Sequence, residues 1–191
     1  MGTPTRSRPR PSFDELYARI RDLGEGVTGQ ILEPGVVSTM SRPGLPHAHA
    51  ESLIDHWLQQ YDARRGGAGW WILREMEVRL PGDLLAVPDL AGWRVERVAQ
   101  LPNENPLTLI PDWCCEVLSP TTERSDRVLK LPLYARAGVR WTWIVDPVGG
   151  FVEVYESVGE RPVRVASAMD EERVVLPPFD GEAPASTWWM H

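Results

Sequence analysis

Residues 113–146 decide the fold, and they read WCCEVLSPTTERSDRVLKLPLYARAGVRWTWIVD. The stretch 113–118 is almost entirely apolar, which is typical of a strand that is covered on both faces. A helix is expected over about 125–137, with Gly138 as its C-terminal cap, and a second apolar strand over 140–145. Strand, helix and strand in this order predict a right-handed crossover with parallel strands. Pro132 counts against the helix, because an internal proline costs about 3 kcal/mol.

The hydrophobic period on either side of this stretch predicts further helices and strands. The predicted helices lie at 12–20, where Ser12 and Glu15 form a capping box, and at 48–61. The predicted strands lie at 30–37 (a strand or half of a hairpin), 70–80, 84–91, 151–155, 163–168 and 173–176. Strict alternation makes 151–155 an antiparallel partner of the strand before it.

The element order predicts one domain of the α/β (α+β) class. We expect a mixed central sheet flanked by helices in the order αβββαβ, followed by a C-terminal β extension. The 191 residues are 42% hydrophobic and 25% charged, the balance of a soluble protein with a real core. Residues 12–191 would form this domain. Residues 1–11, rich in Arg and Pro, would be a disordered arm.

Composition and charge exclude several classes of protein. No stretch is apolar enough to span a membrane and no signal peptide is visible, so we expect no membrane partner and a cytoplasmic location. Cys114 and Cys115 are neighbours in a strand and point to opposite faces, which makes them core residues rather than a disulfide. The net charge of −7 argues against a general nucleic-acid coat protein, although an enzyme with a local basic patch is compatible with it.

Two carboxylates stand out because apolar residues bracket each of them. Asp89 and Glu116 lie on predicted neighbouring strands, where side chains come within about 5 Å and could share one cation. A bound metal would supply the partner that a buried carboxylate needs. A turn aspartate and an arginine-paired glutamate would give the same pattern. Asp112 competes for the metal role, but four residues of strand place it about 13 Å from Glu116.

Lys130 is the only lysine of the chain, beside nineteen arginines. A lysine kept where arginine is otherwise used indicates a need for a compact ammonium donor, although chance would also explain it. His47 and His49 are either exposed polar residues at the start of a helix or site residues, with His47 the better candidate. Asp126 is expected to support the start of its helix rather than to bind metal.

Several motifs resemble the putative restriction endonuclease family, formerly a domain of unknown function, of the PD-(D/E)XK superfamily. The resemblance is dense between about Val87 and Tyr155. It is carried by Val87-Pro88-Asp89, by Glu116-Val117-Leu118-Ser119-Pro120-Thr121-Thr122, by Lys130, by Tyr134-Ala135-Arg136-Ala137-Gly138-Val139 and by Trp143-Ile144-Val145-Asp146-Pro147.

The resemblance implies a restriction-endonuclease-like core and a metal-dependent endonuclease that hydrolyses DNA. Asp89 and Glu116 would bind Mg²⁺, or Mn²⁺ in its place. The superfamily lysine normally falls two residues after the acid, where this chain has Leu118, so the amine would come from Lys130 on the following helix. A homodimer is also expected.

Four further residues complete the expected site. Tyr134 would line it, since it shares a helical face with Lys130. Arg124 and Arg127 would contact phosphates, or else belong to a solvated helix face. Gln30 stands where relatives often have a glutamate. Because an amide binds Mg²⁺ less well than a carboxylate, Gln30 keeps open the alternative of a weak or inactive nuclease fold that works as a DNA-binding or protein-interaction module.

Overall fold

The computed structural model describes residues 10–40, 42–169 and 173–190. Its helical segments are α1 (Phe13–Arg21), α2 (Leu45–Leu58), a 3-10 turn (Ala63–Arg65), α3 (Glu123–Ser125), a π-helical turn (Asp126–Lys130), α4 (Leu131–Ala137) and a second 3-10 turn (Ala185–Trp188). Its strands are β1 (Thr28–Glu33), β2 (Val36–Met40), β3 (Trp70–Arg74), β4 (Val78–Leu80), β5 (Leu84–Ala86), β6 (Leu90–Arg94), β7 (Trp113–Val117), β8 (Trp141–Asp146), β9 (Phe151–Val158), β10 (Arg161–Met169), β11 (Val174–Val175) and β12 (Glu182–Ala183). Most of the predicted arm, 1–11, lies outside the described residues.

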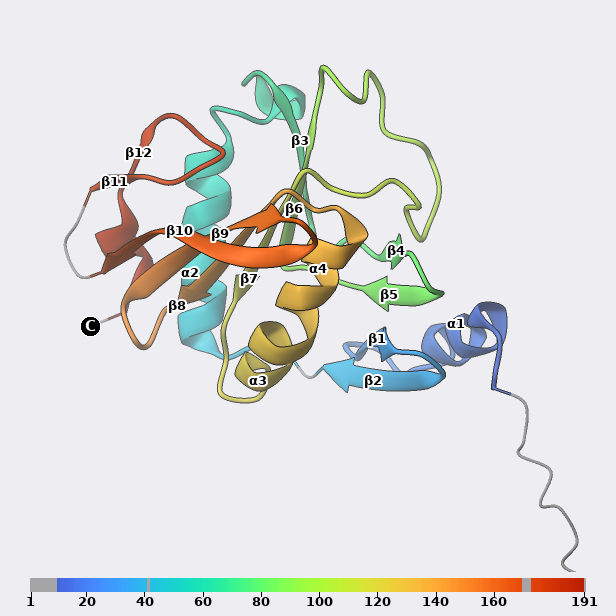
Figure 1. Ribbon diagram of the computed structural model, residues 1–191. Helices are drawn as coiled ribbons and strands as arrows, with labels where there is room; N and C mark the ends of the chain where they lie inside the picture. Colours follow the sequence, from blue (N-terminus) through green and yellow to red (C-terminus); the bar gives the residue numbers. More distant parts are fainter. Residues whose placement is uncertain (1–9, 41, 170–172, 191) are drawn as a thin grey trace, which may run out of the picture.

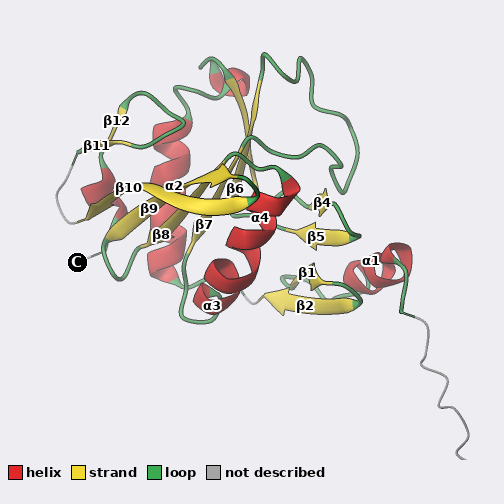
Figure 2. Ribbon diagram, viewed as in Figure 1, coloured by secondary structure: helices red, strands yellow, loops and turns green. Residues whose placement is uncertain are grey.

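The central sheet of the described chain is six-stranded, in the order β10-β9-β8-β7-β6-β3 (Figure 1). Strands β7 and β8 run parallel, with Glu116 opposite Ile144, and the other neighbours in this sheet run antiparallel. This confirms the predicted mixed sheet and the crossover. A separate four-stranded sheet, β2-β1-β5-β4, contacts α1 through β1 and β2 (Figure 2).

Each face of the central sheet is covered by different elements. On one face, α2 and the C-terminal residues 176–189, which include Trp188, bury apolar side chains of the strands, among them Trp113 and Trp143. On the other face, α1, α4 and the four-stranded sheet pack around Trp93 and Cys114. The two cysteines are buried and unpaired, as expected. The central strands β6, β7 and β8 are therefore covered on both sides.

The helix after β7 differs from the prediction in its form. It begins at Glu123, earlier than expected, and its middle turn is π-helical, with the Leu131 N–H donating to the Asp126 carbonyl. Pro132 falls at the start of α4, just after this turn, where a missing N–H costs little. The objection that Pro132 raised to a helix was therefore wrong. Gly138 ends α4 at φ 93°, a left-handed conformation that favours glycine.

The prediction of one continuous strand over 70–80 and another over 84–91 was wrong, because each range is divided between two strands. The chain passes from β3 to β4 at Glu75, which has φ 46°, and from β5 back to β6 through Val87, Pro88 and Asp89. Each predicted strand thus contributes one half to the central sheet and one half to the smaller sheet. The two sheets separate where these two crossings lie together.

The predicted helices at the N-terminal side are confirmed in kind. Helix α1 has the expected capping box between Ser12 and Glu15. Helix α2 begins at Leu45, three residues before the predicted start, so His47 lies within it. His47 is buried, which excludes the alternative of an exposed polar residue. In the part of the chain that the structure describes, no helix is long and apolar enough to cross a membrane.

Candidate active site

The site lies where the two sheets separate. Backbone N–H groups at this point lie outside the hydrogen-bond ladders of the sheets and need other acceptors. The Glu75 N–H donates to the Asp89 carbonyl at 3.0 Å. The Val87 N–H donates to the Gln30 side-chain oxygen at 3.0 Å. The Val117 N–H, at the end of β7, donates to Asp89 Oδ2 at 2.7 Å. These bonds fix the Asp89 carboxylate against the end of β7.

Asp89 and Glu116 are cross-strand neighbours, as the sequence predicted. Leu90 pairs with Cys115 in the antiparallel ladder of β6 and β7, so the preceding Asp89 falls opposite Glu116. Both carboxylates line the same pocket. Asp112, the competing aspartate, instead binds Arg97 at 2.9 Å and lies at the entry to β7.

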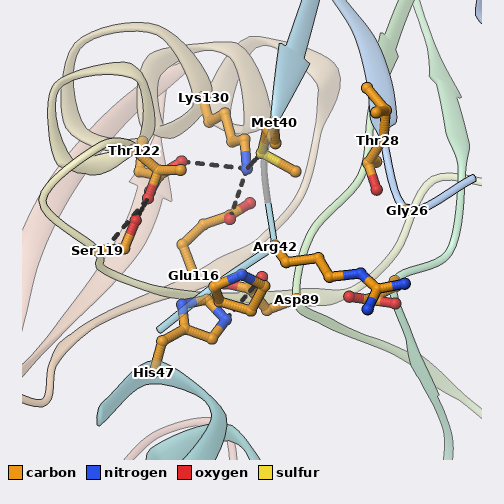
Figure 3. A pocket seen from close by; sticks show the side chains of 14 residues that line it. Gly26, Thr28, Met40, Arg42, His47, Asp89, Glu116, Ser119, Thr122 and Lys130 are labelled. Atoms are coloured by element: carbon orange, nitrogen blue, oxygen red, sulfur yellow. Dashed lines mark hydrogen bonds and ion pairs between the residues drawn. The ribbon is translucent and has the colours of Figure 1, made fainter. Parts of the chain in front are cut away.

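Lys130 reaches Glu116 from the π-helical turn, so the predicted trio converges (Figure 3). Its Nζ is 2.7 Å from Glu116 Oε2 and 3.1 Å from Asp126 Oδ1. Tyr134, one turn further along, donates its hydroxyl to the other oxygen, Glu116 Oε1. Glu116 and Lys130 are each only 1% exposed, so this ion pair is desolvated. The shared helical face of Lys130 and Tyr134 is confirmed.

A cavity of about 350 Å³ opens onto these groups. Its walls come from the β1–β2 hairpin, the segment that leads into α2, the loop after β7 and the π-helical turn. The lining residues are Gly26, Val27, Thr28, Met40, Arg42, Pro43, His47, Glu75, Asp89, Glu116, Ser119, Thr122, Asp126 and Lys130. Four carboxylates thus face this cavity beside one lysine and one arginine, so negative charge is in excess.

Burial and crowding raise the pKa of two of these carboxylic acids, Glu116 and Asp126. Burial raises the pKa of Glu116 well above its usual value, against the lowering effect of Lys130, and the Asp126 and Asp89 carboxylates raise it further. Burial likewise raises the pKa of Asp126. Burial alone would lower the pKa of Lys130, but its three carboxylate neighbours outweigh burial and raise it. The cluster therefore favours an additional positive charge.

His47 faces the same carboxylates from α2. Its Nε2 is 3.4 Å from Asp89 Oδ1 and 4.0 Å from Glu51 Oε2, and its buried Nδ1 has no hydrogen-bond partner among the described residues. Burial lowers the pKa of His47, but Asp89, Glu51 and Asp126 together reverse this and raise it. The prediction that His47 lines the site is consistent with this position.

Several predicted site residues lie elsewhere. Gln30 is buried in β1 with its side-chain oxygen on the Val87 N–H, outside the pocket lining. Tyr134 lies behind Glu116 rather than in the cavity. In the described chain, neither Arg124 nor Arg127 lines the pocket; Arg127 binds Glu153 at 2.6 Å, and Arg124 is exposed. Phosphate contacts by these two arginines stay a prediction.

Asp126 has contacts that the sequence analysis did not predict. It lies in the first turn of its helical segment, as expected, but it is also 1% exposed, lines the pocket and pairs with Lys130. Its Oδ1 atom has no hydrogen-bond partner of good geometry among the described residues. The spacing of four residues between Asp126 and Lys130 is the sequence signal that could have indicated the pair.

The residues present fit a divalent cation. Carboxylate oxygens are the ligands that Mg²⁺ prefers, and the excess of buried negative charge lacks a counter-ion. Among the described residues, no three His, Cys, Asp or Glu side chains form a ready-made metal site. An ion here would therefore be held by Asp89 and Glu116 with water completing its shell, which suits Mg²⁺ because it usually keeps several waters.

Comparison with known proteins agrees with this fold. A solved structure of a putative nuclease of the family DUF820 from Anabaena variabilis superposes with a TM-score of 0.68 at 20% identity, over 94% of this chain and 97% of that one. At this identity the likeness shows the fold, a nuclease-type mixed α+β fold. No curated protein matches the chain. The sequence profile of the Uma2 family, described as putative restriction endonucleases, matches residues 20–182, and the chain therefore belongs to that family.

Proposed function

We propose that the protein is a metal-dependent endonuclease that hydrolyses phosphodiester bonds of DNA. The observation that carries the proposal is the convergence of Asp89, Glu116 and Lys130 in one cavity, with Lys130 Nζ 2.7 Å from Glu116. Two hard carboxylates beside a desolvated ammonium are the groups that phosphodiester hydrolysis requires. Membership of a family of putative restriction endonucleases supports the same reaction.

Asp89 and Glu116 would hold Mg²⁺, with Mn²⁺ as a substitute. A bound ion would supply Lewis acidity toward the phosphoryl oxygens and would lower the pKa of water. The protein prepares this binding by fixing Asp89 through the Val117 N–H and Glu116 through the Tyr134 hydroxyl. Both carboxylates are therefore preorganised before any ligand arrives.

Lys130 would orient the attacking hydroxide and stabilise the negative charge that develops on the phosphorane oxygens. An ammonium acts strongly here because the surrounding site is dry. Asp126, at 3.1 Å, gives the ammonium a second carboxylate partner besides Glu116. Lys130 can then turn one donor to the substrate while Asp126 keeps the side chain in place.

The alternative function, an inactive DNA-binding or protein-interaction module, was motivated by Gln30. The Gln30 side chain supports the backbone of Val87 and lies outside the lining of the cavity. The amide therefore takes no ligand away from the pair formed by Asp89 and Glu116. For this reason we favour turnover over a purely binding role.

Nicking of supercoiled plasmid tests the proposal. We expect the purified protein to nick plasmid with Mg²⁺ or Mn²⁺ and not with EDTA. Lys130→Arg should lower the rate about 100-fold or more, because a guanidinium cannot replace a compact ammonium between two carboxylates. Arg136→Lys, an exposed basic exchange on α4, is the matched control and should keep the rate. Full activity of a folded Lys130→Arg protein, checked by circular dichroism, would refute the role of Lys130.

A further inference from the structure

The reactive pair lies inside the molecule rather than on its surface. Glu116 and Lys130 are each 1% exposed, and the cavity above them is about 350 Å³. A scissile phosphate must therefore enter between the β1–β2 hairpin on one side and the loop 119–122 on the other (Figure 3). A base pair that stays stacked in a duplex does not fit a cavity of this size, whereas an unpaired nucleotide can bring its phosphate to the buried pair.

The arginines of the described chain differ in how far their charge is compensated. Nine of them form ion pairs with carboxylates. The net charge of the whole chain is −7. Among the described arginines without such an ion pair, Arg42 is the only one that lines the cavity.

Arg42 supplies positive charge at the mouth of the cavity. Its exposed side chain lies over Gly26, where an added Cβ atom would come within 2.8 Å of the guanidinium. In Figure 3 it lies on the side of the cavity away from Lys130. Lys130 itself is paired with Glu116 and Asp126. The cations that line the cavity therefore suit one or two phosphates of a single strand.

We propose that this site takes unpaired DNA: a single strand enters the cavity, one of its phosphates reaches Glu116 and Lys130, and Arg42 binds a neighbouring phosphate. The proposal rests on the proposed nuclease function for its chemistry. The strand preference itself follows from the depth of the reactive pair, the small cavity above it and the single arginine in the cavity lining. The proposed substrates are single strands and unpaired regions of duplexes, of any base sequence.

Binding and cleavage of three DNA probes of one sequence test this preference. The probes are a fluorescein-labelled single strand, its perfect duplex and a duplex with a central unpaired bubble. We expect the single strand and the bubble to bind, and to be cut with Mn²⁺, at least tenfold better than the perfect duplex. The logarithm of the single-strand association constant should fall with that of salt at a slope between about −1 and −2, since each phosphate contact contributes about −0.7.

Arg42→Gln should weaken single-strand binding and reduce this slope by about 0.7. Arg136→Gln, an equal loss of charge on an exposed residue outside the cavity lining, is the control and should change neither. A perfect duplex that binds as tightly as the single strand, or an unchanged slope in Arg42→Gln, would overturn the proposal.

Hydrolysis of bis(4-nitrophenyl) phosphate separates this proposal from the proposed function. This small diester needs the reactive groups but no strand preference. Hydrolysis of the diester together with preference for duplex DNA overturns the substrate class alone. Failure to hydrolyse the diester with any divalent metal removes the nuclease function, and the DNA-binding comparison still decides between single and double strands.

Discussion

Strand β7 has two faces that are equally buried and serve opposite purposes. Trp113, Cys115 and Val117 point into the aromatic core beneath α2, and each is fully buried among apolar side chains. Glu116 points to the other face and meets Lys130. Burial on the first face stabilises the fold through apolar area removed from water. Burial on the second face places charges where desolvation opposes them.

This difference shows how the fold supports its site. Apolar burial on the aromatic face offsets the desolvation cost of the charges on the other face. The ladder between β6 and β7 places Asp89 opposite Glu116, and β8 pairs with the other edge of β7. Active sites commonly contain such destabilising groups with shifted pKa values. Substitutions on the aromatic face should therefore lower the stability of the fold, and substitutions on the face of Glu116 should lower activity.

The largest expected effect is on the charged face. Glu116→Gln removes one of the two proposed metal ligands and should lower the rate of DNA nicking by about 1,000-fold, which corresponds to about 4 kcal/mol of transition-state stabilisation. Its free energy of unfolding should change by less than about 1 kcal/mol, because Lys130 keeps Asp126 as its partner and one desolvated, crowded carboxylate is removed. Nicking assays and urea denaturation measure both quantities. A stable variant with wild-type activity would contradict the division between the faces.

On the aromatic face the expected effect is on stability. Trp113→Ala should lower the free energy of unfolding by about 3–5 kcal/mol, since it opens a cavity among Trp143 and Phe179. Trp113→Phe is the matched control, because the buried indole N–H has no hydrogen-bond partner among the described residues. It should cost about 1.5 kcal/mol or less. Urea denaturation gives both values, and equal losses in the two variants would show that packing volume is not the cause.

Removing the tyrosine hydroxyl behind the acid should have a smaller effect. Tyr134→Phe loses the hydrogen bond to Glu116 Oε1 and leaves the ring in the core. We expect about a tenfold fall in the nicking rate, or about 1.4 kcal/mol. Initial rates over a range of Mn²⁺ concentrations measure it. An unchanged rate would mean that Tyr134 does not hold the carboxylate in its active orientation.

The smallest expected effect is the dependence of stability on pH. The folded pKa of Glu116 is raised above its ordinary value of 4.5, so the folded state binds this proton more tightly than the unfolded state does. The resulting stability is present below pH 4.5 and is lost as the pH rises toward the folded pKa. In EDTA, the melting temperature of the wild type relative to Glu116→Gln should therefore fall between pH 5 and pH 8. If the melting temperature of the wild type rises relative to that of Glu116→Gln as the pH increases, the prediction is contradicted.

The crossover and the convergence of Asp89, Glu116 and Lys130 could be predicted, because the local sequence and the family resemblance indicate them. The apolar stretch around Glu116, the glycine after α4 and the following apolar strand define strand, helix and strand without tertiary information. Lys130 was recognised as the only lysine and from the family resemblance. The structure then brought it to Glu116, on the side of the sheet that the crossover covers.

The division into two sheets could not be predicted in the same way. Residues on both sides of Glu75 keep the period of a strand, and only the packing of the smaller sheet forces its positive φ. The burial of His47 likewise depends on where β6 places Asp89, far away in sequence. Asp126 enters the site through the π-helical turn, whose form follows from tertiary contacts as well as from Pro132. The homodimer and the cytoplasmic location stay predictions.

Calorimetric titration of Mn²⁺ into the protein tests most directly whether Asp89 and Glu116 form a metal site. We predict one site in the wild type that is lost in both Asp89→Asn and Glu116→Gln and kept in Asp112→Asn, whose carboxylate binds Arg97 instead. The same Mn²⁺ affinity in all four folded proteins would contradict the assignment of the active site.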